Sequence, residues 1–580
     1  MKIILRYIFK YKIFFLLNII SILFISCGEI IIPFIIGKYV INNVDYMREN
    51  FLKMIFILSI LVILSFLGHL IINFCSSKIS SLIFRDLSTL VFSKIQNFSI
   101  TEIQNIGISK LMNYTTTNIY QIMGFISNFY KTAVIAPIML ITSLVLIYFI
   151  SFKLAYGIFF TIPFFIFMLF FLVKKNYNLS ILQQKESEKI NMIIRENILG
   201  IKIIKSLNQE KYEKNKFEKT NFKFRDLIIK FFVSMISIEP FFYLLLNISI
   251  ILTIGTGAVL IKENYNNPIG LKMGDLYSCI NLQYHVLFSI LNFLLLFMMF
   301  PKTLICVKNI ERILNINTKK FLNICNNKEK LSKIKKIEFE NVFFQYPNSN
   351  KMILEKINFS VESSEIIAFI GKTGSGKTTL VNLIPNLIEP TQGQIKINGI
   401  NINCYDKNEL RAKISFVSQK NILFKGTIFS NLLFGNEQAI EEQMLEKAII
   451  AQADEFIKNK KNQFQEEISE LGANLSGGQK QRLSLTRAFL KEPDIYIFDD
   501  SFSALDYKTD LAIRKSFFSK IKDEIVIIIA QRLSSIMKAD KIVVLSDGKI
   551  VNIGKHEDLI KNCKVYQDIA FSQKIKEVLQ

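Results

Sequence analysis

The sequence contains no tryptophan and only seven cysteines among its 580 residues. Ile, Asn, Lys and Phe are abundant instead, and we interpret this bias as a preference for AT-rich codons rather than as chemistry. No two cysteines follow the CxxC spacing, and their number is odd. The sequence therefore predicts neither a zinc site nor a disulfide framework.

Negative charge is also scarce. The chain has 71 Lys and Arg against 48 Asp and Glu, which gives a formal net charge of +23. Such an excess is typical of proteins that bind nucleic acid, and also of membrane proteins whose cytoplasmic loops are basic. Because the basic residues cluster between hydrophobic stretches, the second interpretation is favoured, and no nucleic-acid partner is expected.

Hydrophobic residues make up 51% of the chain, and phenylalanine alone contributes 52 residues. Six long apolar stretches precede residue 301, and each is close to the ~20 residues that a helix needs to cross a bilayer. A spanning segment must satisfy its backbone hydrogen bonds without water, which a helix does. The predicted membrane helices are 13–36, 51–74, 133–150, 154–173, 241–261 and 276–300.

Basic residues also predict the orientation. The start of the chain and segment 174–230 are rich in Lys and Arg, whereas the expected outer loops carry few. The positive-inside rule then places both ends in the cytoplasm, with the spans in the cytoplasmic (inner) membrane of a bacterium. The long connectors after the second and fourth spans are charged and amphipathic, which predicts helices that continue into the cytoplasm.

Four ionisable residues lie inside the predicted spans: Glu29, His69, Glu239 and His285. An ionisable group is costly in lipid, and each is therefore a candidate substrate contact. Hydrogen bonds between helices, or positions near the lipid headgroups, explain the same residues. The sequence leaves these interpretations open.

The pattern changes after residue 314, where the predicted transmembrane domain, 1–314, ends. A polar, basic linker at 315–336 leads into short apolar strands that alternate with helical patterns, which predicts an α/β domain over 337–580. In this domain the stretch IIAFIGKTGSGKTTLVNLI satisfies G-x-x-x-x-G-K-[ST]. Glycines let backbone N–H groups wrap phosphates, Lys377 would pair with the β- and γ-phosphates, and Thr378 would hold Mg²⁺. The strand IYIFD ends at Asp499, a second candidate metal ligand.

The stretch NLSGGQKQRLSLTRAFL identifies a family. With the glycine loop and the six spans, the chain resembles exporter half-transporters of the ATP-binding-cassette (ABC) family over nearly its whole length. The resemblance implies an all-α six-helix transmembrane domain followed by an α/β P-loop cassette, and ATP-driven export by alternating access. It also implies a dimer, because in this family the residues at Ser476, Gly477, Gly478 and Gln479 meet the γ-phosphate bound by the other subunit.

Further expected roles rest on the same resemblance. Tyr346 would stack on adenine, and Gln419 would sense Mg²⁺. Glu470 would contact the opposite membrane connector, and loop 503–506 would link the two nucleotide sites. The expected ATP contacts in this chain's own site are Tyr346, Gly371, Thr373, Gly374, Ser375, Gly376, Lys377, Thr378, Thr379 and Gln419. The expected Mg²⁺ ligands are Thr378, Gln419 and Asp499.

Two positions depart from the family's pattern. The family places Glu after the strand aspartate, and this chain has Asp500; the family has His in the later HRLS motif, and this chain has Gln531. Shortening Glu to Asp withdraws the carboxylate from the attacking water, and Gln cannot titrate near neutral pH. Together the two changes predict a site that binds Mg-ATP but hydrolyses it poorly, in a heterodimer whose second half-transporter has Glu and His there.

Two alternatives remain beside the heterodimer. One is a homodimer that hydrolyses ATP slowly at both sites, and the other is an ATP-gated regulator or channel without net pumping. The cargo is also open: phenylalanine-rich spans favour a lipophilic or amphipathic small molecule or lipid over a peptide, although packing against membrane lipid explains the same residues.

Overall fold

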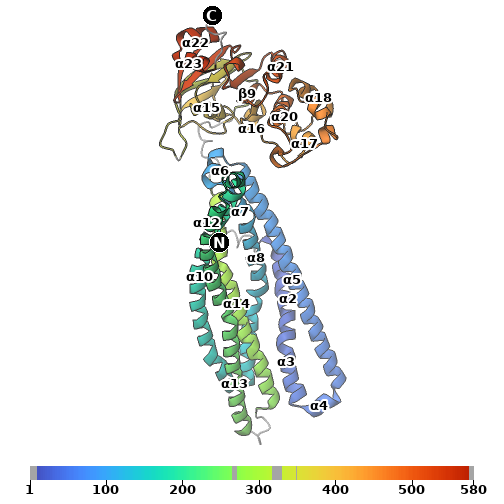
Figure 1. Cartoon of the computed structure of the whole chain (residues 1–580). Helices are drawn as coiled ribbons and strands as arrows, with labels where there is room; N and C mark the ends of the chain where they lie inside the picture. Colours follow the sequence, from blue (N-terminus) through green and yellow to red (C-terminus); the bar gives the residue numbers. More distant parts are fainter. Residues whose placement is uncertain (1–9, 264–270, 317–328, 348, 574–580) are drawn as a thin grey trace. The chain divides into compact units, whose positions relative to one another are not determined.

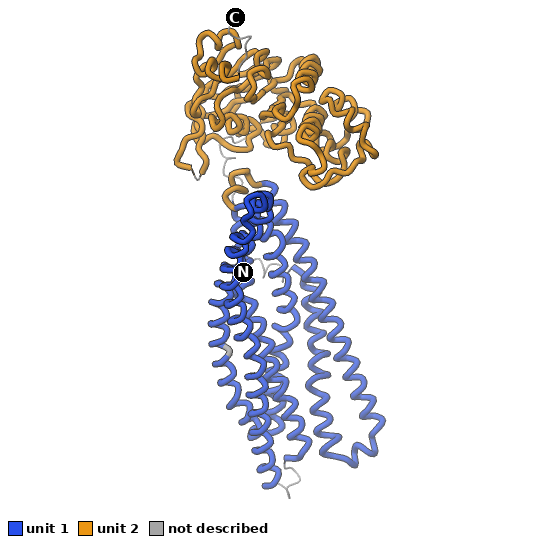
Figure 2. Tube along the Cα trace, in the orientation of Figure 1, with its two compact units in different colours: residues 1–97, 107–316 blue, residues 98–106, 317–580 orange. Residues whose placement is uncertain are grey.

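The computed structural model describes residues 10–263, 271–316, 329–347 and 349–573 (Figure 1). It divides into two compact units, shown in Figure 2. The helical unit comprises the described residues up to Asn97 and from Gly107 to Ile316, and the sheet unit comprises Phe98–Ile106 and the described residues after 316. Most of the predicted linker 315–336 lies outside the described residues, so the expected domain limits stay a prediction.

Six helical stretches of the helical unit are long and apolar enough to cross a membrane, and they contain the six predicted spans. They are Lys12–Ile41, Phe51–Gln96, Ile108–Ile150, Phe152–Leu199, Glu210–Glu263 and Met273–Leu314. The α-helices that build the unit are α2 (Lys12–Ser26), α3 (Ile32–Ile35), α4 (Val44–Glu49), α5 (Phe51–Gln96), α7 (Ile108–Thr115), α8 (Thr117–Thr132), α9 (Ile135–Ile150), α10 (Tyr156–Leu199), α11 (Ile201–Ser206), α12 (Glu210–Ile236), α13 (Ile238–Glu263) and α14 (Met273–Leu314). The prediction of an all-α membrane domain is confirmed.

The helices α5 and α10 continue well beyond their apolar parts. They have 46 and 44 residues, so at ~1.5 Å per residue each is more than twice as long as the ~30 Å hydrocarbon core of a bilayer. The charged connectors after the second and fourth spans are therefore helical, as their amphipathic pattern predicts.

The first span is irregular. Two π-helical segments, η1 (Cys27–Ile31) and η2 (Ile36–Ile41), flank the short helix α3, which contains Pro33. In η2, a Cβ on Gly37 would collide with the backbone of Gly274 in α14. Glycine at both positions lets the first and sixth spans approach closely, as small residues do between membrane helices.

The sheet unit contains two main sheets. Six strands in the order β12-β11-β3-β10-β9-β6 form the first, parallel except for β12, and four antiparallel strands in the order β2-β1-β4-β5 form the second. The strands are β1 (Lys336–Phe344), β2 (Leu354–Glu362), β3 (Ile366–Ile370), β4 (Gln392–Ile397), β5 (Ile400–Asn401), β6 (Ile414–Val417), β9 (Ile495–Asp499), β10 (Ile525–Ile529), β11 (Lys541–Ser546) and β12 (Lys549–Gly554), and the short pair β7 (Gly426–Thr427) and β8 (Glu467–Ile468) lies apart. The predicted α/β class is confirmed.

Apart from α6, the helices of the sheet unit follow β1 in the chain and alternate with its strands. Among the described residues the α-helices of the sheet unit are α6 (Ile100–Ile106), α15 (Lys377–Leu383), α16 (Lys407–Ala412), α17 (Ile428–Leu432), α18 (Glu441–Ile450), α19 (Asp454–Lys458), α20 (Gly477–Leu490), α21 (Tyr507–Phe518), α22 (His556–Asn562) and α23 (Lys564–Ser572). The parallel strands β3, β9 and β10 are adjacent, so their carboxyl ends meet at one edge, where such folds bind ligands.

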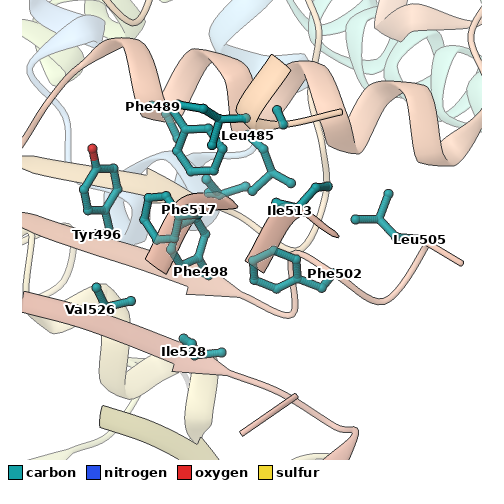
Figure 3. Packing of buried hydrophobic residues seen from close by; sticks show 14 of the residues in the cluster. Leu485, Phe489, Tyr496, Phe498, Phe502, Leu505, Ile513, Phe517, Val526 and Ile528 are labelled. Carbon is teal, nitrogen blue, oxygen red and sulfur yellow. The ribbon is translucent and has the colours of Figure 1, made fainter. Parts of the chain in front are cut away.

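An aromatic cluster anchors the centre of the six-stranded sheet (Figure 3). Phe498 on β9 packs against Phe517 on α21 with ring centroids 5.4 Å apart, and Phe517 stacks on Phe489 of α20 at 4.6 Å. All three side chains are buried. The cluster therefore fixes α20, which begins in the LSGGQ stretch, against the strand that ends at Asp499.

The cysteines match the expectation only in part. Five of those in the described residues are free thiols, and four of these five are buried. Cys404 is disulfide-bonded, a pairing that the cysteine spacing did not predict.

Candidate nucleotide site

The glycine loop between β3 and α15 is shaped by its glycines. Gly374 and Gly376 adopt φ angles of +85° and +98°, which glycine tolerates and other residues rarely do. A Cβ on Gly376 would also come within 2.8 Å of Leu354 Cδ2. Thr373 and Gly374 are exposed at the loop, whereas Ser375 is buried. The loop is a concave run of backbone N–H groups of the kind that cradles phosphates.

Lys377 is held at the mouth of this loop. Its Nζ donates hydrogen bonds to the carbonyl oxygens of Gly371 and Lys372 at 2.7 and 2.9 Å. Burial lowers the pKa of Lys377, while the Asp500 and Asp499 carboxylates act in the opposite direction. The Lys377 ammonium is thus bound by neutral carbonyl oxygens. A charged phosphate oxygen can replace them and form a stronger, charge-assisted hydrogen bond.

Thr378 and Asp499 come together although 121 positions separate them. The Thr378 hydroxyl donates to Asp499 Oδ1 at 3.1 Å. Asp499 is 2% exposed, and burial raises its pKa against the opposing Thr378 hydrogen bond. A buried carboxylate paired with a hydroxyl is a donor set that suits Mg²⁺, a cation that binds oxygen ligands and shares them with substrate phosphates. The two side chains therefore fit the predicted metal, and their contact with Mg²⁺ stays a prediction.

Gln419, the third expected metal ligand, follows β6 and is exposed. It lies close enough to Asp500 to oppose the rise in pKa that burial causes there. The structure thus places Gln419 beside the carboxylate that follows the metal candidate, and its contact with Mg²⁺ stays a prediction.

The two residues that depart from the family's pattern, Asp500 and Gln531, are in direct contact. Gln531 Nε2 donates to Asp500 Oδ2 at 3.0 Å. Asp500 has a φ of +50°, a left-handed conformation that Asp tolerates better than most residues, and its backbone N–H donates to Ile529 O at 3.0 Å. Burial raises the pKa of Asp500, and among the effects that lower it the Ser503 hydrogen bond is the largest. The end of β9 therefore fixes both the backbone and the carboxylate of Asp500.

Tyr346 lies beside the same loop. Its hydroxyl is 3.3 Å from Thr379 Oγ1 in α15, and its ring meets Phe344 edge-on with centroids 4.9 Å apart. The half-buried ring therefore lies next to the helix that follows the phosphate loop, on a strand end, where a base can stack on it.

The LSGGQ stretch forms a complete helix start within one chain. Ser476 Oγ accepts from Gln479 N at 3.3 Å, and the Gln479 side chain accepts from Ser476 N at 3.0 Å, which is a capping box. Ser476 and Gly477 are exposed. Because the hydroxyl only accepts in this cap, its proton remains available to an incoming anion at the start of α20.

Two residues that connect elements of the site, Gln481 and Ser501, were not predicted from the sequence. Gln481, on the buried side of α20, accepts from Ala504 N at 3.1 Å and so ties the LSGGQ helix to loop 503–506. Ser501 donates to Val417 O at 3.0 Å and joins the end of β9 to β6. The available signal for Gln481 was its position two residues after Gln479 in the LSGGQ helix; nothing in the sequence pointed to Ser501.

Two further expected positions have local roles. Glu470 is exposed in a short 3₁₀ turn. Asp506 caps α21 by accepting from Thr509 N at 3.0 Å. No contact of either residue in the described part of the chain tests its expected role between subunits.

Comparisons with known proteins find relatives of both the helical and the sheet unit. The family model of the ABC transporter transmembrane region matches residues 15–291, and the model of the ABC transporter family matches residues 354–503. The uncharacterized ABC transporter ATP-binding protein YfiB of Bacillus subtilis is 31% identical over 79% of this chain and 78% of its own. A Staphylococcus aureus protein provisionally named a multidrug export ATP-binding/permease protein is 43% identical over 40% of each chain.

The fold is matched by a solved structure as well. A bacterial Atm1-family ABC exporter with ATP bound aligns with a TM-score of 0.82 over 98% of both chains, at 21% identity.

Proposed function

This chain belongs to the ABC transporter family, as an exporter half-transporter with a membrane domain and an ATP-binding domain, and on that premise we propose that it is the ATP-holding subunit of an unequal pair. Its own site binds Mg-ATP and turns it over slowly. Its LSGGQ stretch completes the fast site of a second half-transporter.

The contact between Gln531 and Asp500 carries the proposal. A general base must lie within ~2.6–3.2 Å of the water that it activates. Asp500 is one methylene shorter than Glu, and its Oδ2 is bound by the Gln531 amide at 3.0 Å. The carboxylate is thereby turned toward its own chain, and general-base help of ~10²–10⁴ in rate is largely lost.

Binding is expected to survive this loss. Lys377 and the pair Thr378–Asp499 keep positions suited to phosphate and Mg²⁺. When bound, Mg²⁺ would neutralise charge on the β- and γ-phosphates. The chain's own residues orient the nucleotide, and Gln531 has a second amide N–H that can donate toward the γ-phosphate.

The partner completes the cycle. Half-transporters generally dimerise, and we assign Ser476, with the N–H groups of Gly477 and Gly478, to the γ-phosphate of the partner's ATP. The partner would have Glu and His where this chain has Asp500 and Gln531. Closure of the two cassettes on ATP would then drive alternating access of the spans, in the cytoplasmic membrane of a bacterium, for a lipophilic or amphipathic cargo.

The test compares ATP hydrolysis by the full-length chain, alone and with a candidate second half-transporter, in lipid nanodiscs. We expect slow phosphate release by the chain alone and fast release by the pair. In the pair, Ser476→Ala in this chain should remove most of the rate, whereas Asp500→Asn should leave it nearly unchanged.

Two outcomes favour the alternatives. Brisk hydrolysis by the chain alone that disappears with Asp500→Ala identifies a homodimer with two working sites and overturns the unequal pair. ATP-dependent flux in inside-out vesicles that runs only down a gradient identifies a gated assembly rather than a pump.

A further inference from the structure

Three of the four ionisable residues predicted inside the spans meet at one place in the helical unit. Glu29 Oε1 lies 3.1 Å from His69 Nε2 on α5, and Glu29 Oε2 lies 3.8 Å from His285 Nδ1 on α14. Three separate spans thus contribute to one cluster. Glu239, the fourth residue, is exposed in the first turn of α13, and among the described residues it is not part of this cluster.

The backbone at Glu29 is specialised. Glu29 lies in the π-helical segment η1, and such single-turn π-helices often mark functional sites. The preceding Gly28 is buried against Ser65 of α5, where a Cβ would collide with the serine side chain. This close packing fixes the turn from which the Glu29 side chain projects.

The charge of Glu29 is incompletely matched. Its side chain is 36% exposed, and in the described part of the chain its recorded ion pairs are with the two histidines alone, with no Lys or Arg within 4.0 Å. A neutral imidazole offers one hydrogen bond but no positive charge. Because an unmatched carboxylate is costly among membrane helices, Glu29 favours a cation or a proton beside it.

One cavity is lined by this cluster, and a second cavity adjoins it. The first, of about 220 Å³, is lined by polar and charged groups that include Glu29, His69, Lys131, His285 and Asn292. The second, of about 630 Å³, lies between α9, α10 and α14, and its walls include Phe170, Phe293 and Phe297. Ala136 and Ser289 line both cavities, so a charged compartment borders a large aromatic one.

We infer that these cavities form one binding site for an amphipathic cation, whose charged head pairs with Glu29 and whose apolar body occupies the aromatic cavity. The inference rests on the proposed export function and names the cargo's chemical class. An aromatic lining favours a cationic body as well, because ring faces attract positive charge. The volume of the larger cavity lies within the ~300–1,000 Å³ typical of small-molecule sites.

Other polar groups compete for the Glu29 carboxylate. The titratable or charged groups that face Glu29 are His69 on α5, His285 on α14 and Lys131 on α8, and α9 contributes only apolar residues. Both imidazoles already contact the Glu29 carboxylate, and the charged head of a cargo would have to displace them.

The test measures binding of radiolabelled tetraphenylphosphonium, and of the size-matched anion tetraphenylborate, to the full-length chain in nanodiscs without ATP. We expect Glu29→Gln to weaken cation binding about tenfold or more, equivalent to ~1.4 kcal/mol, while anion binding is kept. The matched control, Glu49→Gln on the exposed helix α4, should change neither. The double variant His69→Gln/His285→Gln, which removes both imidazoles and keeps Glu29, should bind the cation at least as tightly as the wild type.

Cation binding within about twofold of wild type in Glu29→Gln overturns the inference. If Glu29→Gln loses both probes because it misfolds, the histidine variant decides, and a loss of cation binding of about tenfold or more with anion binding kept overturns the inference. Failure here also differs from failure of the proposed function. ATP-driven transport without Glu29-dependent cation binding overturns this site alone, and cation binding without transport overturns the export function alone.

Discussion

The Gln531 amide and the Asp500 carboxylate are joined by a hydrogen bond of 3.0 Å at the carboxyl end of β9. Glutamine donates to the carboxylate but cannot take up or release a proton near neutral pH. The contact thus joins a carboxylate to an amide that donates a hydrogen bond, at the two positions where we propose that this chain lacks the Glu and His of a fast site.

Restoring both side chains should create a working site. In the chain alone, Asp500→Glu with Gln531→His should raise ATP hydrolysis by ~10²–10⁴, the usual value of general-base catalysis. Phosphate release in nanodiscs measures the rate. Asp500→Asn is the control and should alter the slow wild-type rate by less than about tenfold, because little base catalysis is left to lose. An unchanged rate in the double variant would show that another element limits hydrolysis.

Thr378→Ala should raise the Mg²⁺ concentration needed for ATP binding. The change removes one of the two oxygens that lie 3.1 Å apart. A lost hydrogen bond or ligand costs ~1 kcal/mol, which corresponds to about a fivefold rise in the Mg²⁺ concentration needed. Fluorescent-ATP binding during a Mg²⁺ titration measures it. Ser519→Ala, at the exposed end of α21, is the control, and chelation of Mg²⁺ from the wild type should weaken ATP binding further than the variant does.

Gln481→Leu should slow the pair while sparing ATP binding to this chain's own site. The change leaves Ala504 N without its 3.1 Å acceptor. An unsatisfied donor costs ~1–3 kcal/mol of stability, and we expect loop 503–506 to be held less firmly against α20. Gln481→Glu keeps an acceptor and should restore the rate. Hydrolysis by the pair and nucleotide binding by the chain alone separate the two effects. Equal loss of rate in both variants would argue against a positioning role.

Phe498→Ala should destabilise the sheet unit strongly. Removing the buried ring from the cluster with Phe489 and Phe517 typically costs ~3–5 kcal/mol, and calorimetry of the full chain should show an earlier transition. Phe571→Ala, whose side chain is 77% exposed, should change stability by less than ~0.5 kcal/mol. A similar transition temperature in both variants would contradict the packing argument.

Local patterns were sufficient for much of this architecture. The spans follow from long apolar runs, and the phosphate loop follows from glycines that its left-handed turns require. The continuation of α5 to Gln96 was predicted from charged amphipathic sequence. These features depend on neighbouring residues, and for that reason a single sequence displays them.

Contacts between distant segments could not be predicted in this way. Glu29 and His285 are 256 positions apart, and only the packing of α14 against the first span brings them together. The π-helical turn at Cys27–Ile31 likewise depends on its fit against α5 rather than on propensity. The same is true of Gln481, whose partner Ala504 lies in another loop.

The capping box at Ser476 bears on how the transporter is made. Because Gln479 of the same chain finishes the helix start, the LSGGQ surface reaches its final shape during folding of a single polypeptide. Each subunit can then fold and insert into the membrane on its own. Two subunits would dimerise only afterwards, through surfaces that are already formed. Relative expression of the two subunits would then set how many unequal pairs a cell assembles.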